Sequence, residues 1–438
     1  MENLFEPVVP AKKLNSNFNL VKQNVGYEPA RRMLEKVYGE FENIDGNFLQ
    51  QFQTTGFDQR IFELYLFAYL KDSGFEFERG YDRPDFIIKK DGYRVAIEAT
   101  TVNPVSKADT SISDEENYKD LSPEEIKFKL EQELPIKFGS PLYSKLKKKY
   151  WKLDHCQETP LILAIQSFHE EGSLRYSSTS LVNYLYGSQD KVKDGKIVQE
   201  EITEHRLHEK VIPSGFFKSP DSENISAVIF SNSGSIAKFQ RMGYIRGFVS
   251  NHIKIKRSGF CYNFEKNALE PESFDYDLDE VDYDEPWGEE LVVCLNPYAK
   301  HPIPKDFFPN AAQVYLHNSR VMTDIFGFTP FSSRTLIINV GGEDNELPKG
   351  IKKISKRLMD ELVPERTILP FLHEKEWFMS TDKKYIGIIV FDNSDRTFNV
   401  IILKKNNNRY TAVRTFIDVE NVAKAQTCIF EELNKAAL

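Results

Sequence analysis

Two acidic residues frame a predicted β-hairpin in this chain. Asp85 opens the apolar run 86–88, and Glu98 follows the apolar run 95–97, with a turn at 90–92 between them. Short apolar runs joined by a turn that contains glycine are typical of two paired, buried strands. Because a hairpin brings the start of its first strand beside the end of its second, the two carboxylates are expected to lie side by side. Two carboxylates in that arrangement can share one divalent cation.

A metal site and a structural role are both compatible with Asp85 and Glu98. A Pro-Asp sequence often only starts a turn, and Glu98 could be a solvated strand end. The apolar neighbours favour a metal, because a carboxylate against buried strands is costly unless a metal, a proton or a cation compensates its charge. The helix predicted over 57–71 adds a third acid, Glu63, which either pairs with a neighbour such as Arg60 or binds the metal.

These residues resemble the PD-(D/E)XK nuclease superfamily. The stretch 57–169 has the superfamily's order of a helix with an acid, a hairpin with Pro-Asp and Glu, a second helix and a further strand. The resemblance implies a restriction-endonuclease-like α/β core, in which helices flank a mixed sheet. It also implies hydrolysis of DNA phosphodiester bonds with Mg²⁺ or Mn²⁺, in host defence or in a mobile element. Asp85 and Glu98 would hold the metal, with Glu63 as a further ligand.

The sequence departs from the superfamily at one catalytic position. The superfamily places a lysine two residues after the glutamate, where this chain has Thr100, which can hydrogen-bond but carries no charge. Either another lysine acts there or the fold has lost catalysis. Lys145 is the candidate, because superfamily members relocate the basic residue to the following helix; a solvated or phosphate-contacting lysine is the other interpretation. A catalytically inactive scaffold that binds nucleic acid or protein is therefore the alternative function.

A cluster of lysines around Lys145 predicts nucleic acid, specifically DNA, as the partner. Residues 135–152 contain six lysines and no acid, although the whole chain has a net charge of −9. The segment 265–290 accounts for that charge, since it contains 12 acids and one lysine. A local basic surface beside the hairpin suits a phosphate backbone, and a solvated helix face has the same composition. The lysines expected to contact DNA are Lys147, Lys148 and Lys149.

Composition divides the chain into three predicted parts. Residues 1–25 are polar and are predicted to form an N-terminal arm, and residues 26–365 a nuclease-like domain that includes the acidic segment 265–290 as a solvated connection. A charged helix is predicted over 351–362. Residues 366–438 are predicted to form a small β-β-β-α domain, with strands at 385–391, 398–403 and 410–414 and a helix at 419–435.

This C-terminal unit is a candidate surface for a protein partner or for a homodimer. The acidic segment could in turn mimic nucleic acid or bind a basic partner. An adaptor that works through these two regions is a third class of function. The phrases at 98–101, 238–243 and 294–297 are also similar to a group of bacterial proteins without an assigned activity.

Cysteine usage and hydropathy predict a cytoplasmic protein. The four cysteines are scattered and form no Cys-x-x-Cys pair, which fits a reducing compartment and argues against zinc ribbons and disulfides. The first residues lack the charged lead and apolar core of a signal peptide, and no apolar run approaches the length of a membrane span. We therefore expect no membrane partner.

Overall fold

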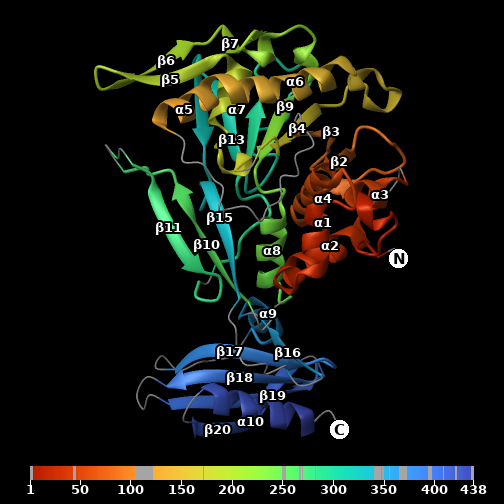
Figure 1. Ribbon diagram of the computed structural model, residues 1–438, viewed down its shortest axis with the longest axis vertical. Helices are drawn as coiled ribbons and strands as arrows, with labels where there is room; N and C mark the ends of the chain where they lie inside the picture. Colours follow the sequence, from red (N-terminus) through yellow and green to blue (C-terminus); the bar gives the residue numbers. More distant parts are fainter. Residues whose placement is uncertain are drawn as a thin grey trace.

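The computed structural model places a large α/β part at one end of the long axis and a C-terminal sheet at the other (Figure 1). The structure describes residues 3–42, 46–103, 122–170, 172–248, 253–265, 268, 270–281, 283–339, 347, 350–354, 356–364, 372–392, 397–407, 409–419 and 422–435.

An eight-stranded sheet forms the centre of the large part. In order across the sheet, its strands are β1 (Glu76–Phe77), β2 (Phe86–Lys90), β3 (Tyr93–Val102), β4 (Leu161–Ser167), β9 (Ala227–Ser231), β12 (Leu291–Leu295), β13 (Ala312–His317) and β14 (Arg320–Asp324). The first three strands are antiparallel neighbours, whereas β3, β4 and β9 are parallel. The sheet is therefore mixed, as the sequence predicts for an α/β protein.

Helices cover both faces of this sheet (Figure 1). One face packs against α1 (Ser16–Gln23), α2 (Glu28–Glu40), α3 (Phe48–Phe52), α4 (Phe57–Asp72) and α8 (Ile236–Ile245). The other face packs against α6 (Leu134–Lys147) and α7 (Thr179–Tyr186), and α5 (Pro123–Phe128) precedes α6. Strand side chains alternate between these two cores, so that Ile162 lies on the α4 side and Leu163 on the α6 side.

The elements that carry the predicted acids form where the sequence places them. The helix predicted over 57–71 is confirmed as α4, which is buried around most of its circumference. The predicted hairpin is confirmed as β2 and β3. Its turn contains Asp91 and Gly92, whose φ values of 51° and 81° lie in the left-handed region that glycine adopts without strain.

The N-terminal residues pack against the core, where the sequence predicts an arm. Phe5 and Phe18 are buried, and their rings stack with centroids 5.6 Å apart. Phe52 of α3 meets Phe18 edge to face at 6.1 Å. The polar composition of residues 1–25 gives no sign of this packing, because it depends on a few aromatic side chains that each bury a large apolar area.

Part of the acidic segment is also buried, which corrects the prediction of a solvated connection. Glu285 and Glu289 are each only 2% exposed. Residues 272–277 form β11 in a three-stranded sheet whose order is β11 (Glu272–Asp277), β10 (Ile253–Cys261) and β15 (Pro330–Asn339). Two hairpins complete this part of the fold: β5 (Ser188–Lys193) with β6 (Lys196–Glu201), and β7 (Glu204–Leu207) with β8 (Lys210–Pro213).

The C-terminal sheet has five strands, two more than the sequence predicts. They are β16 (Ile351–Ile354), β17 (Leu372–Ser380), β18 (Tyr385–Asp392), β19 (Thr397–Asn406) and β20 (Arg409–Val419), in that order across the sheet, with α9 (Lys356–Leu362) and α10 (Val422–Lys435). The helix predicted over 351–362 is wrong in its first turn, because β16 buries Ile351 and Ile354. The boundary predicted after residue 365 falls between α9 and β17, so β16 belongs to the sheet but precedes the boundary.

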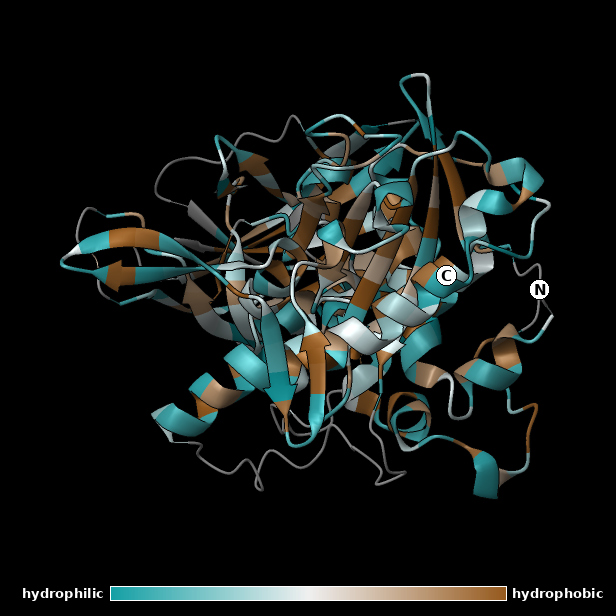
Figure 2. Cartoon of the chain, turned by 90° about the horizontal axis from the view of Figure 1, so that it is seen from above, coloured by the Kyte–Doolittle hydropathy of each residue, from teal (hydrophilic) through white to brown (hydrophobic). Residues whose placement is uncertain are grey.

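Hydrophobic residues gather in the strands at the centre of the molecule, and polar residues dominate the loops around them (Figure 2). None of the helices in the described part of the chain has both the length and the apolar character needed to cross a bilayer.

Candidate functional site

The register of the hairpin brings Asp85 and Glu98 together. Phe86 of β2 pairs with Ile97 of β3, so Asp85 and Glu98 occupy the next positions along the two strands. Opposite residues of an antiparallel pair project to the same side. The backbone N–H of Ala99 also donates a 2.7 Å hydrogen bond to Asp85 Oδ2. The hairpin therefore sets the position of Asp85, and its backbone holds one oxygen of the Asp85 carboxylate by a hydrogen bond.

Lys145 of α6 contacts Glu98. It lies near the end of α6, and its Nζ forms an ion pair with Glu98 Oε1. Tyr150 donates a 2.5 Å hydrogen bond to the same oxygen. Burial and the neighbouring Glu98 raise the pKa of Tyr150, so its phenol stays protonated and acts as a donor. The fold thus brings Lys145 onto Glu98, although the two residues are 47 positions apart in the chain.

Glu63 approaches from α4 and is held by two neighbours. Arg60 Nη1 pairs with Glu63 Oε2 at 2.6 Å, and Gln59 Nε2 donates to Glu63 Oε1 at 2.8 Å. Gln59 Oε1 in turn accepts a 3.1 Å hydrogen bond from the hydroxyl of Thr101 on β3. The pairing with Arg60 that the sequence allowed is present, and Gln59 ties Glu63 to the strand that carries Glu98.

The charges of Glu63, Asp85, Glu98 and Lys145, which we call the carboxylate site, influence one another. Burial raises the pKa of Asp85 well above its usual value, and the negative charges of Glu63 and Glu98 raise it further. Lys145 opposes this shift. Three carboxylates and two cations, Lys145 and Arg60, leave a negative excess. Among the described residues, Glu63, Asp85 and Glu98 do not offer three ligand atoms that all lie within 4.8 Å of one another.

The three lysines predicted to contact DNA lie around the end of α6. Lys147 Nζ lies 4.4 Å from the centre of the Tyr143 ring, and Lys148 Nζ lies 5.8 Å from the centre of the Tyr150 ring. Lys149 Nζ pairs with Asp221 at 2.9 Å, although both side chains are more than 40% exposed. Such exposed pairs contribute little energy, so the ammonium groups remain accessible to a phosphate.

A cavity of about 660 Å³ lies away from the carboxylate site, between α7 and β15. Ser180 and Asn232 line it, and the Oγ of Ser180 and the Oδ1 of Asn232 are buried without a hydrogen-bond partner among the described residues. None of the four residues of the carboxylate site lines this cavity. The three acids therefore lie outside this cavity.

Sequence reasoning missed Gln59 and Tyr150 as parts of the site. Tyr150 stands 52 residues from Glu98, and Gln59 stands 42 residues from Thr101. No local pattern marks such contacts. The only signal for Tyr150 is its place directly after the lysine-rich turn of α6, beside the predicted catalytic lysine.

Comparison of the chain with protein-family models, with curated proteins and with solved structures gives no match.

Proposed function

We propose that this protein is a metal-dependent nuclease that hydrolyses phosphodiester bonds in DNA, with Mg²⁺ or Mn²⁺ as the metal. The observation that carries the proposal is the ion pair between Lys145 and Glu98. It brings a lysine to the glutamate in the second strand of the hairpin, although Thr100 occupies the usual lysine position. A host-defence or mobile-element role follows only from the resemblance to the PD-(D/E)XK superfamily.

The order of elements supports the same proposal. The acid-bearing helix α4 is followed by the antiparallel strands β1, β2 and β3, then by α6 and by β4, which is parallel to β3. This is the order that the resemblance implies for a restriction-endonuclease-like core.

The residues of the carboxylate site fit a divalent metal in charge and in ligand type. Mg²⁺ and Mn²⁺ prefer carboxylate oxygens. Burial, and then the negative charges of Glu63 and Glu98, raise the pKa of Asp85, and a bound cation would favour its charged form. Asp85 and Glu98 would hold the metal, with Glu63 as a further ligand. A metal bound there would lower the pKa of a coordinated water and stabilise charge on the phosphate.

The protein's own residues would position these groups. The N–H of Ala99 orients the Asp85 carboxylate, and Tyr150 orients that of Glu98. Lys145 would transfer part of its contact from Glu98 to the phosphate as negative charge develops there, which is the electrostatic role of a preorganised cation. Lys147, Lys148 and Lys149, at the end of α6, would attract the DNA backbone.

A catalytically inactive scaffold that binds nucleic acid or protein is the second candidate function. It is favoured by the internal compensation of two acids: Glu98 is paired with Lys145, and Glu63 with Arg60. In that case the same contacts would serve the fold alone.

Cleavage of linear, circular and single-stranded DNA and of RNA distinguishes the two candidates. Wild type and Asp85→Ala are compared with Mg²⁺, with Mn²⁺ and with chelator. We expect metal-dependent cleavage of DNA by wild type and none by Asp85→Ala. Cleavage that survives both chelator and Asp85→Ala would refute the mechanism. DNA binding by wild type without cleavage under any condition would favour the scaffold.

A further inference from the structure

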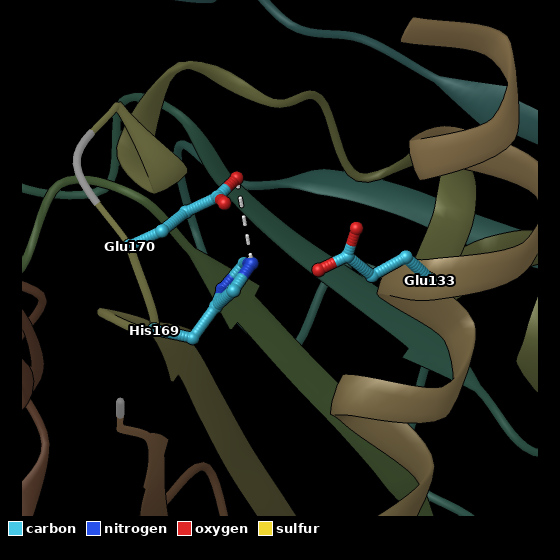
Figure 3. Close-up of side chains that lie close together, drawn as sticks. All are labelled: Glu133, His169 and Glu170. Atoms are coloured by element: carbon cyan, nitrogen blue, oxygen red, sulfur yellow. Dashed lines mark ion pairs between the residues drawn. The ribbon is translucent and has the colours of Figure 1, made fainter. Parts of the chain in front are cut away.

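A second group of ligand-type side chains lies at the opposite end of α6. Glu133 ends a π-helical segment (Lys129–Glu133) that leads into α6, and His169 and Glu170 follow the end of β4. One ligand atom from each lies within 4.8 Å of those of the other two. In Figure 3 the His169 ring and the two carboxylates point toward one another. π-Helical segments often occur at functional sites.

The Nε2 atom of His169 is buried without a hydrogen-bond partner among the described residues, and it points toward the two carboxylates (Figure 3). The His169 side chain is 1% exposed. The nearest carboxylate oxygen, Glu170 Oε1, is 3.6 Å away. A buried polar atom without a partner is costly and calls for an explanation, such as an ion. A metal ion would satisfy Nε2 and bring both carboxylates closer to it.

The hydrogen bond of the other ring nitrogen, Nδ1, also suits His169 to metal binding. Nδ1 shares a 2.6 Å hydrogen bond with the hydroxyl of Ser167, and a contact of this kind on one ring nitrogen orients a metal-binding imidazole. Burial lowers the pKa of His169 to about 4, so the ring is neutral at pH 7. Neutral imidazole is the form that binds metals.

Two cations compete for this site, Lys129 and Lys137, since the charges of both act on His169. Lys129 Nζ is hydrogen-bonded to both oxygens of Glu170, and Tyr176 donates to Glu170 Oε1 at 3.3 Å. The ammonium of Lys129 neutralises one of the two carboxylates, which leaves Glu133 and the imidazole to attract a further ion. Glu133 and Lys129 also line a surface hollow of about 390 Å³, so this carboxylate can be reached from the surface.

We propose that Glu133, His169 and Glu170 bind one divalent transition-metal ion of the Zn²⁺ class, in a site separate from the carboxylate site. One imidazole and two carboxylates are ligands that Zn²⁺ accepts, with a water completing the coordination. Lys145 follows Glu133 by twelve residues along α6, which corresponds to about 18 Å of helix. The metal would join the start of α6 to the end of β4, and its presence does not depend on nuclease activity.

Zn²⁺ titration of the full chain, followed by calorimetry and by thermal unfolding, tests the proposal. The Asp85→Asn background weakens the carboxylate site, and the comparison with variants of the second site assigns the Zn²⁺ that still binds. We expect that background to bind one Zn²⁺ and to unfold at a higher temperature when Zn²⁺ is bound. His169→Gln added to it should weaken binding by at least about 100-fold, since loss of even an outer contact costs a metal site 10- to 100-fold. His317→Gln, at an exposed histidine, is the matched control and should bind Zn²⁺ like its parent.

Two further variants keep the test decisive. Glu133→Gln retains the size of the side chain, so it replaces His169→Gln if that variant does not fold, and it too should weaken Zn²⁺ binding. Lys129→Gln removes one of the two competing ammonium groups and should tighten binding by roughly tenfold, the scale of a partly screened charge interaction. Failure of the Asp85→Asn protein to bind Zn²⁺, or equal Zn²⁺ affinity in the parent, His169→Gln and Glu133→Gln, would overturn the proposal.

Discussion

The carboxylate site and a second region both bury acids, but they balance the charge differently. The second region, the buried ion network, joins three carboxylates to three cations: Glu285, Glu289, Glu290, Lys238, Arg241 and Arg257. Glu285 accepts contacts of 2.6 Å from Lys238 and 2.7 Å from Arg241. Among the described residues, two of the three acids of the carboxylate site form ion pairs, Glu98 with Lys145 and Glu63 with Arg60, whereas Asp85 forms none. A balanced group is suited to holding a fold, whereas an unbalanced one leaves a place for a further cation.

The pKa values of Glu285 and Asp85 shift in opposite directions. Burial alone would raise the pKa of Glu285, but Arg241, Arg257 and Lys238 hold it well below its usual value. The pKa of Asp85 is raised well above its usual value by burial and by its acidic neighbours. Glu289, at the edge of the network, has a raised pKa because burial outweighs the effect of Arg257. The contrast therefore rests on Glu285 and Asp85.

The largest expected effect is on stability, from Glu285→Ala. It leaves buried cations without their carboxylate, so the free energy of unfolding should fall by about 3–5 kcal/mol. Because the folded-state pKa of Glu285 is lowered, its contribution is present above the unfolded pKa of about 4.3 and is lost as the pH falls further. Urea unfolding at several pH values measures both. Glu280→Ala, at an exposed acid of the same segment, should change stability by at most about 0.5 kcal/mol. Equal effects of the two substitutions would contradict a structural network.

Lys145→Ala should affect catalysis more than stability. Loss of one preorganised contact to the transition state costs about 100-fold or more in rate, so DNA cleavage should fall by that factor. Lys145→Arg retains the charge and should retain part of the activity. Cleavage rates under single-turnover conditions, together with a circular dichroism spectrum, separate the two effects. Cleavage by Lys145→Ala at the wild-type rate would remove this residue from the mechanism.

A smaller effect is expected from reversing the charge of the three lysines near the end of α6. Lys147, Lys148 and Lys149 replaced together by Glu should weaken DNA binding, by roughly tenfold or more at low salt, and should reduce the salt dependence of the affinity. The matched control reverses three exposed lysines of the C-terminal sheet, Lys383, Lys404 and Lys405. Fluorescence anisotropy with labelled DNA gives both affinities. A control that weakens binding as much would place the DNA surface elsewhere.

The smallest effect is a gain in stability in Asp85→Asn when no metal is present. Since the folded-state pKa of Asp85 is raised, its stabilising contribution is full below the unfolded pKa of about 3.9 and is lost as the pH rises through the folded value. Asn cannot ionise, so the variant should be more stable than wild type at pH 7 by roughly 0.5–2 kcal/mol. Unfolding in chelator tests this, and a less stable variant would indicate that the Asp85 charge is already compensated.

The sequence predicts elements whose signals are local. The apolar circumference of α4 and the two runs of the hairpin are continuous in the chain, so Glu63, Asp85 and Glu98 could be placed on elements without a structure. The burial of Glu285 could not be predicted, because its partners Lys238 and Arg257 come from distant segments. Composition alone made that segment look solvated.

The absence of a local sequence signal also explains the other differences between the predicted and the observed structure. β16 has two lysines between its buried isoleucines, and in β17 charged residues precede the buried ones. A strand of this kind is recognised only when neighbouring strands cover it. Glu133 and His169 lie 36 positions apart and share no motif, so their proximity follows from the packing of α6 against β4 alone. A histidine two residues after a buried strand is the sequence signal for that group.

A crystal of the wild-type protein soaked with Mn²⁺ tests the central claim most directly, namely that the negative excess of the carboxylate site holds a divalent metal. Anomalous scattering locates the ion independently of the protein atoms. The account predicts a Mn²⁺ peak between the carboxylates of Asp85 and Glu98, at about 2.1–2.2 Å from their oxygens, and no such peak in Asp85→Asn. Saturating Mn²⁺ that leaves this position empty, with Lys145 still on Glu98, would contradict it.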